Sequence, residues 1–204
     1  MADKQAKPAI RFAGFTDLWE QRKLGDVANF SGGHTPSMAI AENYVENGHM
    51  WLTSQDIKNT YLVGSTSTLS DKGIAELRQY DPGTLVMVVR SGILRHTLPI
   101  SMIMVPSAVN QDIKAMEIKG CNSSLWLLYS LKSAERFLLR NYSKTGTTVE
   151  SMDSDKLKDL PLNVPTEAEQ KKIGSFFRNL DHLITLHQRQ TDFYKKISFY
   201  YISS

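Results

Sequence analysis

The feature that most constrains the fold is a proline-free segment that follows Pro165 and continues to Ser204. Thr166 with Glu169 three residues later is a capping-box pattern, which predicts the start of a helix. Beyond it, residues recur at alternating steps of three and four, the spacing of a heptad seam. The seam consists of Ile173, Phe176, Leu180, Leu183, His187, Gln190, Tyr194, Ile197 and Tyr201.

A helix over residues 166–201 would be about 54 Å long, which exceeds the width of a domain of this size. We therefore expect the segment 165–204 to project and to pack its seam against another helix. The middle of the seam is polar, at His187 and Gln190, and such positions weaken a coiled coil but fix its register and partner. The alternative is a helix that kinks and folds back on its own domain.

Residues 11–164 predict a mixed α/β domain, preceded by a polar tail over residues 1–10. Short apolar runs predict strands at 50–53, 84–89 and 98–105, and the alternation of apolar and polar residues predicts a half-buried strand at 113–118. Ser70 is positioned to cap a short helix, and Ser124 a longer one that continues to about Leu139. The predicted fold class is α+β, with a mixed α/β domain followed by a long coiled-coil-type helix.

Composition indicates a globular chain and excludes some classes. The 204 residues are 41% hydrophobic, which is enough to build a core. The single Cys121 excludes an internal disulfide framework and an all-cysteine metal site. No apolar run is long enough to span a membrane, and the polar start lacks the core of a signal peptide. We therefore expect a cytoplasmic protein.

The sequence contains no cluster typical of catalysis. It lacks a Walker-type phosphate loop and a G-x-G-x-x-G motif, and its five histidines are scattered. The formal charge of +3 is too small to indicate nucleic-acid binding by itself. We therefore expect a chain that is not an enzyme and binds no cofactor.

Six segments resemble, in order, the motifs of specificity subunits of type I restriction-modification systems. They are RFxGFxxxW with LGDV over residues 11–27, SGGHTPS over 31–37, WLTSQDI over 51–57, NQD over 110–112, TGTT over 145–148, and EQKKIG through LDxLI over 169–184. One departure is His34, which is inserted into the Gly-Gly-Thr-Pro-Ser turn of the family and alters its backbone.

The resemblance implies a function. In this family a target recognition domain reads one half of a bipartite site in double-stranded DNA, and a long helix sets the distance to the other half. Modification (methyltransferase) subunits and a restriction/translocase subunit assemble around the helices and perform the chemistry. S-adenosylmethionine, ATP and magnesium are then expected on those partner subunits, and none on this chain.

The resemblance covers one half of a usual specificity subunit. After Gln190 the family continues with a lysine-rich stretch and a second recognition domain, which this sequence lacks. A natural half-subunit, a truncated gene and an expressed fragment all remain open. Self-association through the helix, or pairing with a second half-subunit, would use Ile173, Phe176, Leu180, Leu183, His187, Tyr194, Ile197 and Tyr201. A two-fold dimer would read a palindromic site.

DNA contact requires local segregation of charge, because the part before residue 167 carries 18 basic and 17 acidic residues. Arginine pairs with guanine and glutamine with adenine, so we expect base or backbone contacts from Arg90, Arg95 and Gln111. Loop hydroxyls and a lysine suit phosphates or base edges. These candidates are Ser91, Lys144, Thr145, Thr147 and Thr148. The alternative for each residue is a solvated surface side chain.

Three other functions remain as alternatives. The chain could be a recognition domain that works with a methyltransferase outside a type I system. It could be a helical assembly factor that does not contact DNA. It could also be a nuclease or methyltransferase in its own right, which the missing cofactor loop and the missing paired carboxylates disfavour.

Overall fold

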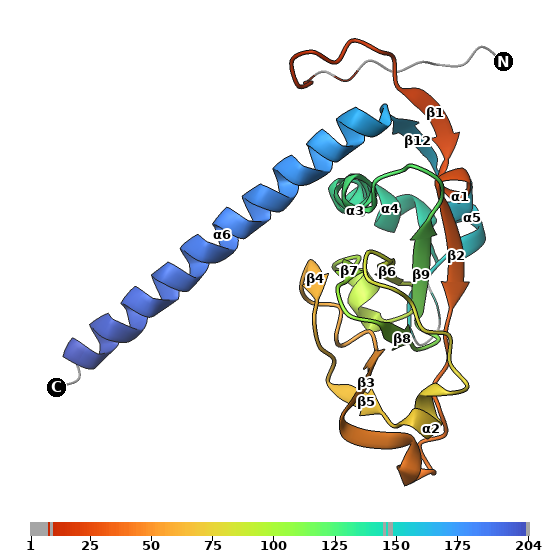
Figure 1. The fold of residues 1–204 in the computed structure, drawn as a ribbon, viewed down its shortest axis with the longest axis vertical. Helices are drawn as coiled ribbons and strands as arrows, with labels where there is room; N and C mark the ends of the chain where they lie inside the picture. Colours follow the sequence, from red (N-terminus) through yellow and green to blue (C-terminus); the bar gives the residue numbers. More distant parts are fainter. Residues whose placement is uncertain (1–7, 9, 145, 147–148, 203–204) are drawn as a thin grey trace.

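A computed structural model describes residues 8, 10–144, 146 and 149–202 of the chain. It contains a mixed α/β body from which one long helix, α6 (Glu167–Ile202), projects (Figure 1). The predicted fold class of a mixed α/β domain followed by a long projecting helix is confirmed. Because α6 is a single element of 36 residues, the alternative of a helix that folds back at a kink is wrong.

The body is built around a five-stranded sheet. In spatial order its strands are β2 (Ala28–Gly32), β9 (Ile113–Ile118), β6 (Leu85–Val88), β7 (Ile100–Ile103) and β4 (Tyr61–Leu62). Neighbouring strands are antiparallel, except that β4 runs parallel to β7. Every residue of β6 and β7 is buried, which explains why both were recognisable in the sequence as short apolar runs.

A second, three-stranded sheet has the order β5 (Ser67–Leu69), β3 (Tyr44–Leu52) and β8 (Ser107–Val109). Strand β3 is longer than the predicted strand, and its register with β5 shifts between Tyr44 and His49. Trp51 of β3 forms a small buried cluster with side chains of β5, α2 and β8. This sheet and α2 lie at the end of the body opposite the start of α6 (Figure 1).

Two short strand pairs complete the body. Strand β1 (Glu20–Lys23) pairs antiparallel with β12 (Pro161–Val164), which places the N-terminal segment beside the residues that lead into α6. Strand β10 (Ser143–Lys144) pairs antiparallel with β11 (Ser151–Met152). The shorter helical elements are α1 (Leu24–Val27), η1 (Ala41–Asn43), α2 (Asp71–Ile74), η2 (Gly92–Arg95) and α5 (Ser154–Lys158). Ser70 caps α2 as predicted.

The long helix predicted over 124–139 is two helices, α3 (Ser124–Ser133) and α4 (Glu135–Tyr142). The cap is the preceding residue Ser123, and the helices meet at Ala134. Directly after this junction the Glu135 carboxylate accepts hydrogen bonds from Thr97 Oγ1 at 2.5 Å and from the Leu98 amide at 2.8 Å. We attribute the break to this contact with a distant loop, which the apolar pattern of the helix could not reveal.

Helix α3 links the main sheet to α6. Its residues Trp126, Leu127, Leu128 and Leu131 are buried in the central core cluster together with side chains of β6, β7 and β9. On its other side α3 packs against the first turns of α6, and Figure 1 shows it between the sheet and the long helix. The direction in which α6 leaves the body therefore depends on α3.

Candidate functional site

Two of the cations predicted to contact DNA are held by a single short segment, residues 150–153. Arg95 Nε donates to Glu150 Oε1 at 2.6 Å. Lys144 Nζ lies 2.8 Å from Asp153 Oδ2. Arg95 belongs to η2 and Lys144 to β10, so the fold brings together residues that are 49 positions apart in the sequence.

The loop after β6 joins the same segment. Arg90 forms an antiparallel bridge with Ser151, and its Nε donates to Asp112 Oδ1 at 2.8 Å. The amide of Ser91 donates to the Glu150 carbonyl at 3.1 Å, and the Ser91 hydroxyl caps η2. Four of the candidates named from the sequence therefore surround one short segment.

Gln111 extends this group toward the turn that contains the inserted His34. Its side-chain oxygen accepts a hydrogen bond from Thr35 Oγ1 at 2.8 Å. The preceding Gly33 lies so close to the backbone that an added Cβ would be 1.8 Å from the Val109 carbonyl oxygen. A glycine is therefore required here whatever follows it in the turn. We call Arg90, Ser91, Arg95, Gln111 and Lys144 the recognition cluster.

The three cations of the recognition cluster are neutralised within the chain. The side chains of Arg90 and Arg95 are each 57% exposed and that of Lys144 is 65% exposed, yet each pairs with a carboxylate. The carboxylates are less exposed, at 21% for Asp112, 13% for Glu150 and 23% for Asp153. The cation is therefore the part of each pair that another anion can reach from solvent.

Two of the acidic partners, Glu150 and Asp153, have lowered pKa values and stay ionised at neutral pH. The hydrogen bond from Arg95 lowers the pKa of Glu150. The hydrogen bond from Lys144 lowers the pKa of Asp153. The cluster therefore presents fixed hydrogen-bond donors without a large net positive charge. The remaining candidates, Thr145, Thr147 and Thr148, lie outside the described residues.

The aspartate of the WLTSQDI segment has a structural role. Asp56 accepts hydrogen bonds from the amides of Thr53 and Thr66 at 2.8 Å and 2.7 Å, and from both hydroxyls. Burial alone would raise the pKa of Asp56, but the hydrogen bonds from Thr66 and Thr53 outweigh it, and the pKa is lowered. The carboxylate thereby fixes the loop between β3 and β5.

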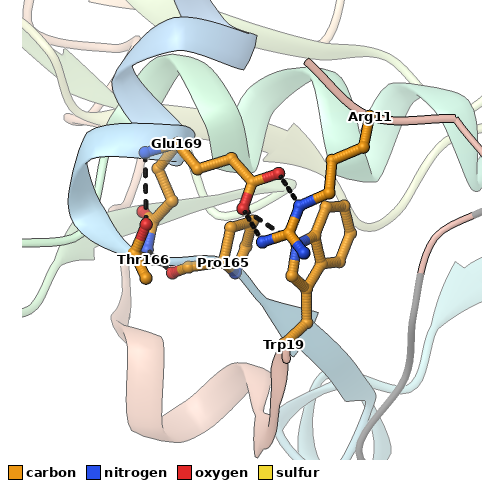
Figure 2. Close-up of polar contacts among 6 residues, drawn as sticks. Arg11, Trp19, Pro165, Thr166 and Glu169 are labelled. Atoms are coloured by element: carbon orange, nitrogen blue, oxygen red, sulfur yellow. Dashed lines mark hydrogen bonds and ion pairs between the residues drawn. The ribbon is translucent and has the colours of Figure 1, made fainter. Parts of the chain in front are cut away.

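The start of α6 is fixed by a buried carboxylate (Figure 2). Glu169 is fully buried. Its oxygens accept from Arg11 Nε at 2.7 Å, from Arg11 Nη2 at 2.6 Å and from Trp19 Nε1 at 3.0 Å. The hydrogen bond to Glu169 raises the pKa of Arg11. The RFxGFxxxW segment and the EQKKIG segment therefore contact each other directly, through Arg11, Trp19 and Glu169.

This contact corrects the predicted capping box. The helix begins where the pattern predicted, and the Thr166 hydroxyl accepts from the Glu169 amide at 3.4 Å (Figure 2). The reciprocal contact from the Glu169 side chain is replaced by the bonds to Arg11 and Trp19. A guanidinium gives charge-assisted, two-point hydrogen bonds to a carboxylate, which are stronger than a bond from one backbone amide.

The next turns of α6 pack closely against α3. Gln170 is buried, and its side chain accepts from the Ser123 amide at 2.8 Å and donates to the Pro165 carbonyl at 3.0 Å. Gly174 lies so near α3 that an added Cβ would be 2.6 Å from Leu125 Cβ. The position requires glycine because the two helix backbones approach closely there.

Two further contacts with the body are made between two and about three turns after Glu169. The ring of Phe177 lies 5.4 Å from that of Tyr129. The Tyr129 hydroxyl donates to Asp181 Oδ2 at 2.8 Å and is also 2.8 Å from the Tyr61 hydroxyl. Burial raises the pKa of Tyr129, and these hydrogen bonds raise it further. We call Glu169, Gln170, Gly174, Phe177 and Asp181 the helix dock; the last four follow at steps of four, three and four, which places them on one helix face.

The predicted helix-partner residues divide into two groups. Ile173 packs against the core of its own body, and the Phe176 ring lies 5.4 Å from that of Phe12. Leu180, Leu183, His187 and Tyr194 are exposed; Leu183 and Tyr194 are each 59% exposed. The side chains of Ile197 and Tyr201 lie outside the described part. Large apolar side chains of Ile184, Leu186 and Phe193 are exposed on the same helix.

The described residues include neither a candidate metal site nor a membrane-spanning helix. They contain no group of three or more histidine, cysteine, aspartate or glutamate side chains placed to hold a metal ion. None of the helices described is both long enough and apolar enough to cross a membrane.

Comparison with known proteins agrees with this architecture. Residues 16–192 match the model of the type I restriction modification DNA specificity domain. The chain is 29% identical over 194 residues to the type I restriction enzyme EcoR124I/EcoR124II specificity subunit of Escherichia coli, covering 88% of this chain and 48% of that protein. It is 26% identical over 188 residues to the MjaIX specificity subunit of Methanocaldococcus jannaschii, covering 88% and 42%.

Solved structures share the fold. The HsdS subunit of Thermoanaerobacter tengcongensis superposes with a TM-score of 0.63 at 16% identity, over 91% of this chain and 42% of that one. A type I restriction-modification structure concerned with complex assembly and conformational transition gives 0.65 at 17% identity, over 91% and 43%. The chain belongs to the type I restriction modification DNA specificity domain family. It corresponds to one half of a type I specificity subunit, with a single target recognition domain, and spans about half the length of its curated relatives.

Several residues of these sites were not predicted from the sequence. Thr35 lies in the SGGHTPS segment, but only its hydrogen bond to Gln111 shows that it joins the recognition cluster. Arg11 and Glu169 stand in motifs, and their contact spans 158 positions. No local pattern signals a pairing at that separation.

Proposed function

We propose that this chain is the non-catalytic DNA-recognition unit of a type I restriction-modification enzyme and reads one half of a bipartite target. The observation that carries the proposal is the match to the DNA specificity family over residues 16–192, combined with a recognition body docked to a projecting helix. The body supplies the DNA contacts, and the helix supplies the distance and the docking surface.

In the proposed mode of binding, the recognition cluster exchanges its internal ion pairs for contacts to DNA. Arg90, Arg95 and Gln111 take base edges or backbone, and Ser91 and Lys144 take phosphates. Asp112 and Glu150 hold the two arginine side chains in the free chain. They keep the guanidinium groups oriented until DNA replaces the two carboxylates. The recognition cluster then binds best to bases whose hydrogen-bond acceptors match the donors of the two guanidinium groups.

The proposed partners follow from the exposed part of α6. Apolar side chains on a soluble helix mark an interaction surface, and several remain uncovered beyond the helix dock. Modification subunits and a restriction/translocase subunit assemble there, and these partners bind S-adenosylmethionine, ATP and magnesium. The chain itself binds no cofactor. It also pairs through α6 with a second half-subunit or with a second copy of itself. Pairing of two identical copies produces a symmetric target.

Selection from a pool of randomised duplexes tests the reading of DNA. The chain assembled with its modification subunit should enrich one short defined sequence. In Arg90→Gln/Arg95→Gln that preference should weaken by about 10-fold or more, since a good bidentate contact contributes about 1–3 kcal/mol of discrimination. Arg78→Gln/Lys72→Gln is the matched control, because these cations are also exposed and ion-paired.

The outcomes separate the competing functions. An unchanged preference in the double arginine variant would exclude the recognition cluster as the reader. Assembly with the modification subunit but no enrichment of any sequence would favour a helical assembly factor. Cleavage or methylation of DNA by the chain alone, with magnesium and S-adenosylmethionine, would identify an enzyme.

Light scattering tests the pairing of the helix. A mass near twice 23.0 kDa for the chain alone would support self-association through α6. A monomer that gains mass only with the modification subunit would contradict self-association and leave the exposed face to other partners.

A further inference from the structure

A cleft of about 750 Å³ separates α6 from the segment that leads into β4. One wall is formed by residues 58–61 and Val63 of the body, and the other by α6 from Arg178 to Arg189, which overlaps the end of the helix dock. Figure 1 shows β4 on the side of the body that faces the long helix. Asp181, which lines the cleft, is held by Tyr129, so the dock fixes the distance between the two walls.

Cations predominate among the charged side chains that line the cleft, while Tyr61, Val63, Ile184 and Leu186 contribute apolar surface. Lys58 contributes from the body, and Arg178 and Arg189 contribute from α6, together with His182. The one carboxylate among the lining residues is Asp181, and it already accepts a hydrogen bond. All three cations are exposed, and no ion pair involves any of them in the part of the chain that the structure describes.

The helical side chains in this wall form a row. Arg178, His182, Thr185 and Arg189 follow at steps of four, three and four, so they lie on one face of α6. Eleven residues separate the two arginines, which corresponds to about 17 Å along the helix. Neutral hydrogen-bond donors of Asn59, Thr60 and Gln188 stand among the cations.

The charge state of this surface differs from that of the recognition cluster. There, each cation is paired with a carboxylate of the chain. In the cleft no carboxylate among the described residues lies within ion-pair distance of the three cations, so their positive charge remains available to an approaching polyanion.

We propose that this cleft binds phosphates of the DNA backbone. The proposal rests on the proposed function, because it requires that the chain engages DNA. Duplex DNA carries one negative charge per about 1.7 Å of its axis, so a row of about 17 Å faces several phosphates at once. Arginine forks, a lysine and amide or hydroxyl donors are the groups that contact phosphates in protein–DNA complexes. The cleft adds affinity without sequence preference, outside the bases that the recognition cluster reads.

An acidic segment of the modification subunit is the competing occupant. Duplex DNA fits better because its phosphates repeat evenly along its length. They can therefore face the cations of the cleft, which form an extended row with polar groups between them. Val63, Ile184 and Leu186 also line the cleft and would offer such an acidic segment apolar contacts, so the row of cations, unpaired within the described chain, is the observation that favours DNA.

The test compares two charge-matched variants of the full chain assembled with its modification subunit. Lys58→Gln/Arg178→Gln/Arg189→Gln removes the cations of the cleft. Lys23→Gln/Lys72→Gln/Lys158→Gln removes three exposed cations that are ion-paired elsewhere. Affinity for a random-sequence duplex is measured from about 50 to 200 mM salt, the range over which phosphate contacts dominate.

If the proposal holds, the cleft variant loses about 2 to 3 units from the slope of log affinity against log salt, since each phosphate contact contributes about 0.9. At about 0.1 M salt each lost contact then weakens binding about eightfold. The control variant keeps the wild-type slope, and both variants keep the preferred half-target.

Three results would overturn the proposal. An unchanged slope in the cleft variant, with normal DNA binding, refutes the cleft but leaves the proposed function intact. Loss of the modification subunit with unchanged DNA affinity assigns the cleft to a protein segment. Absence of DNA binding by the wild-type assembly refutes the proposed function itself.

A second measurement does not depend on removing charge. In a Cys121→Ser background, Thr185→Cys carries a tethered iron chelate that cleaves nearby DNA. Backbone cuts are expected at positions adjacent to the half-target. A probe on Lys72→Cys, on α2, serves as the reference, and cuts no stronger from Thr185 than from that reference would contradict the proposal.

Discussion

Gly174→Ala should tilt the long helix away from the body. The new Cβ would lie 2.6 Å from Leu125 Cβ and 3.0 Å from the Trp126 amide nitrogen. Carbon atoms pack at about 3.5–4.0 Å, so α6 must move by about 1 Å at this point. Glu169 holds the helix five residues earlier, about 7.5 Å away along the axis. The movement therefore corresponds to a tilt of about 8°.

The tilt grows along the helix. Leu186 is 17 residues from Glu169, or about 26 Å, so it should move by about 3 Å. The end of α6 should move by about 6–7 Å, which is close to two base-pair steps of DNA at about 3.4 Å each. The stability cost is small, because overpacking costs about 1–3 kcal/mol and replacing a helical glycine by alanine returns about 1 kcal/mol.

Pulsed electron–electron resonance measures this movement directly. In a Cys121→Ser background, spin labels at Val63→Cys and Leu186→Cys report the distance across the cleft, which both residues line. We expect the mean distance to increase by about 3 Å in Gly174→Ala. Gly92→Ala is the matched control, since an added Cβ there meets nothing within 4 Å. A folded Gly174→Ala protein with an unchanged distance would refute the reasoning on the dock.

Three further predictions concern polar groups that are buried or half-buried. Glu169→Gln should lower the melting temperature clearly more than Glu167→Gln, which changes an exposed carboxylate of the same helix turn; equal melting temperatures in thermal denaturation would argue against the buried contact. The pKa of Asp56 is lowered in the folded state, so its stabilisation is present above the unfolded value of about 4 and is lost as pH falls through the folded pKa. The stability difference between wild type and Asp56→Asn in urea titrations should therefore shrink below about pH 4, and a constant difference would be inconsistent with this. Tyr129→Phe and Asp181→Asn should be non-additive by about 0.5–3 kcal/mol in a double-mutant cycle, whereas strict additivity would show that the two groups do not interact.

The sequence predicted those elements whose cause is local. Strand β9 spans the same residues, 113–118, as the alternating pattern. The start of α6 and the cap of α2 follow from side chains within three residues of each helix end. The projecting helix could be predicted because the heptad spacing after Pro165 continues for longer than a domain of this size is wide.

What escaped prediction depends on residues far apart in the chain. The division of α3 from α4 accompanies contacts between Glu135 and a loop 37 residues away. Arg95 looked like a free cation until the fold placed Glu150, 55 residues later, against it. Counting the charges in a short segment of the sequence cannot identify ion-pair partners that lie so far apart in the chain. The assignment of individual residues to DNA therefore stays a prediction, as do the domain limits and the choice of partners.

Base-resolution mapping of methylation tests the central claim most directly. The chain is expressed with its modification subunit in a host without other adenine methyltransferases, and modified sites are read from the genome. The account predicts a bipartite motif in which Arg90→Gln/Arg95→Gln relaxes the bases of a half-site that this chain reads and keeps the spacer length. A motif identical in both proteins would contradict the claim that this chain reads DNA through the recognition cluster.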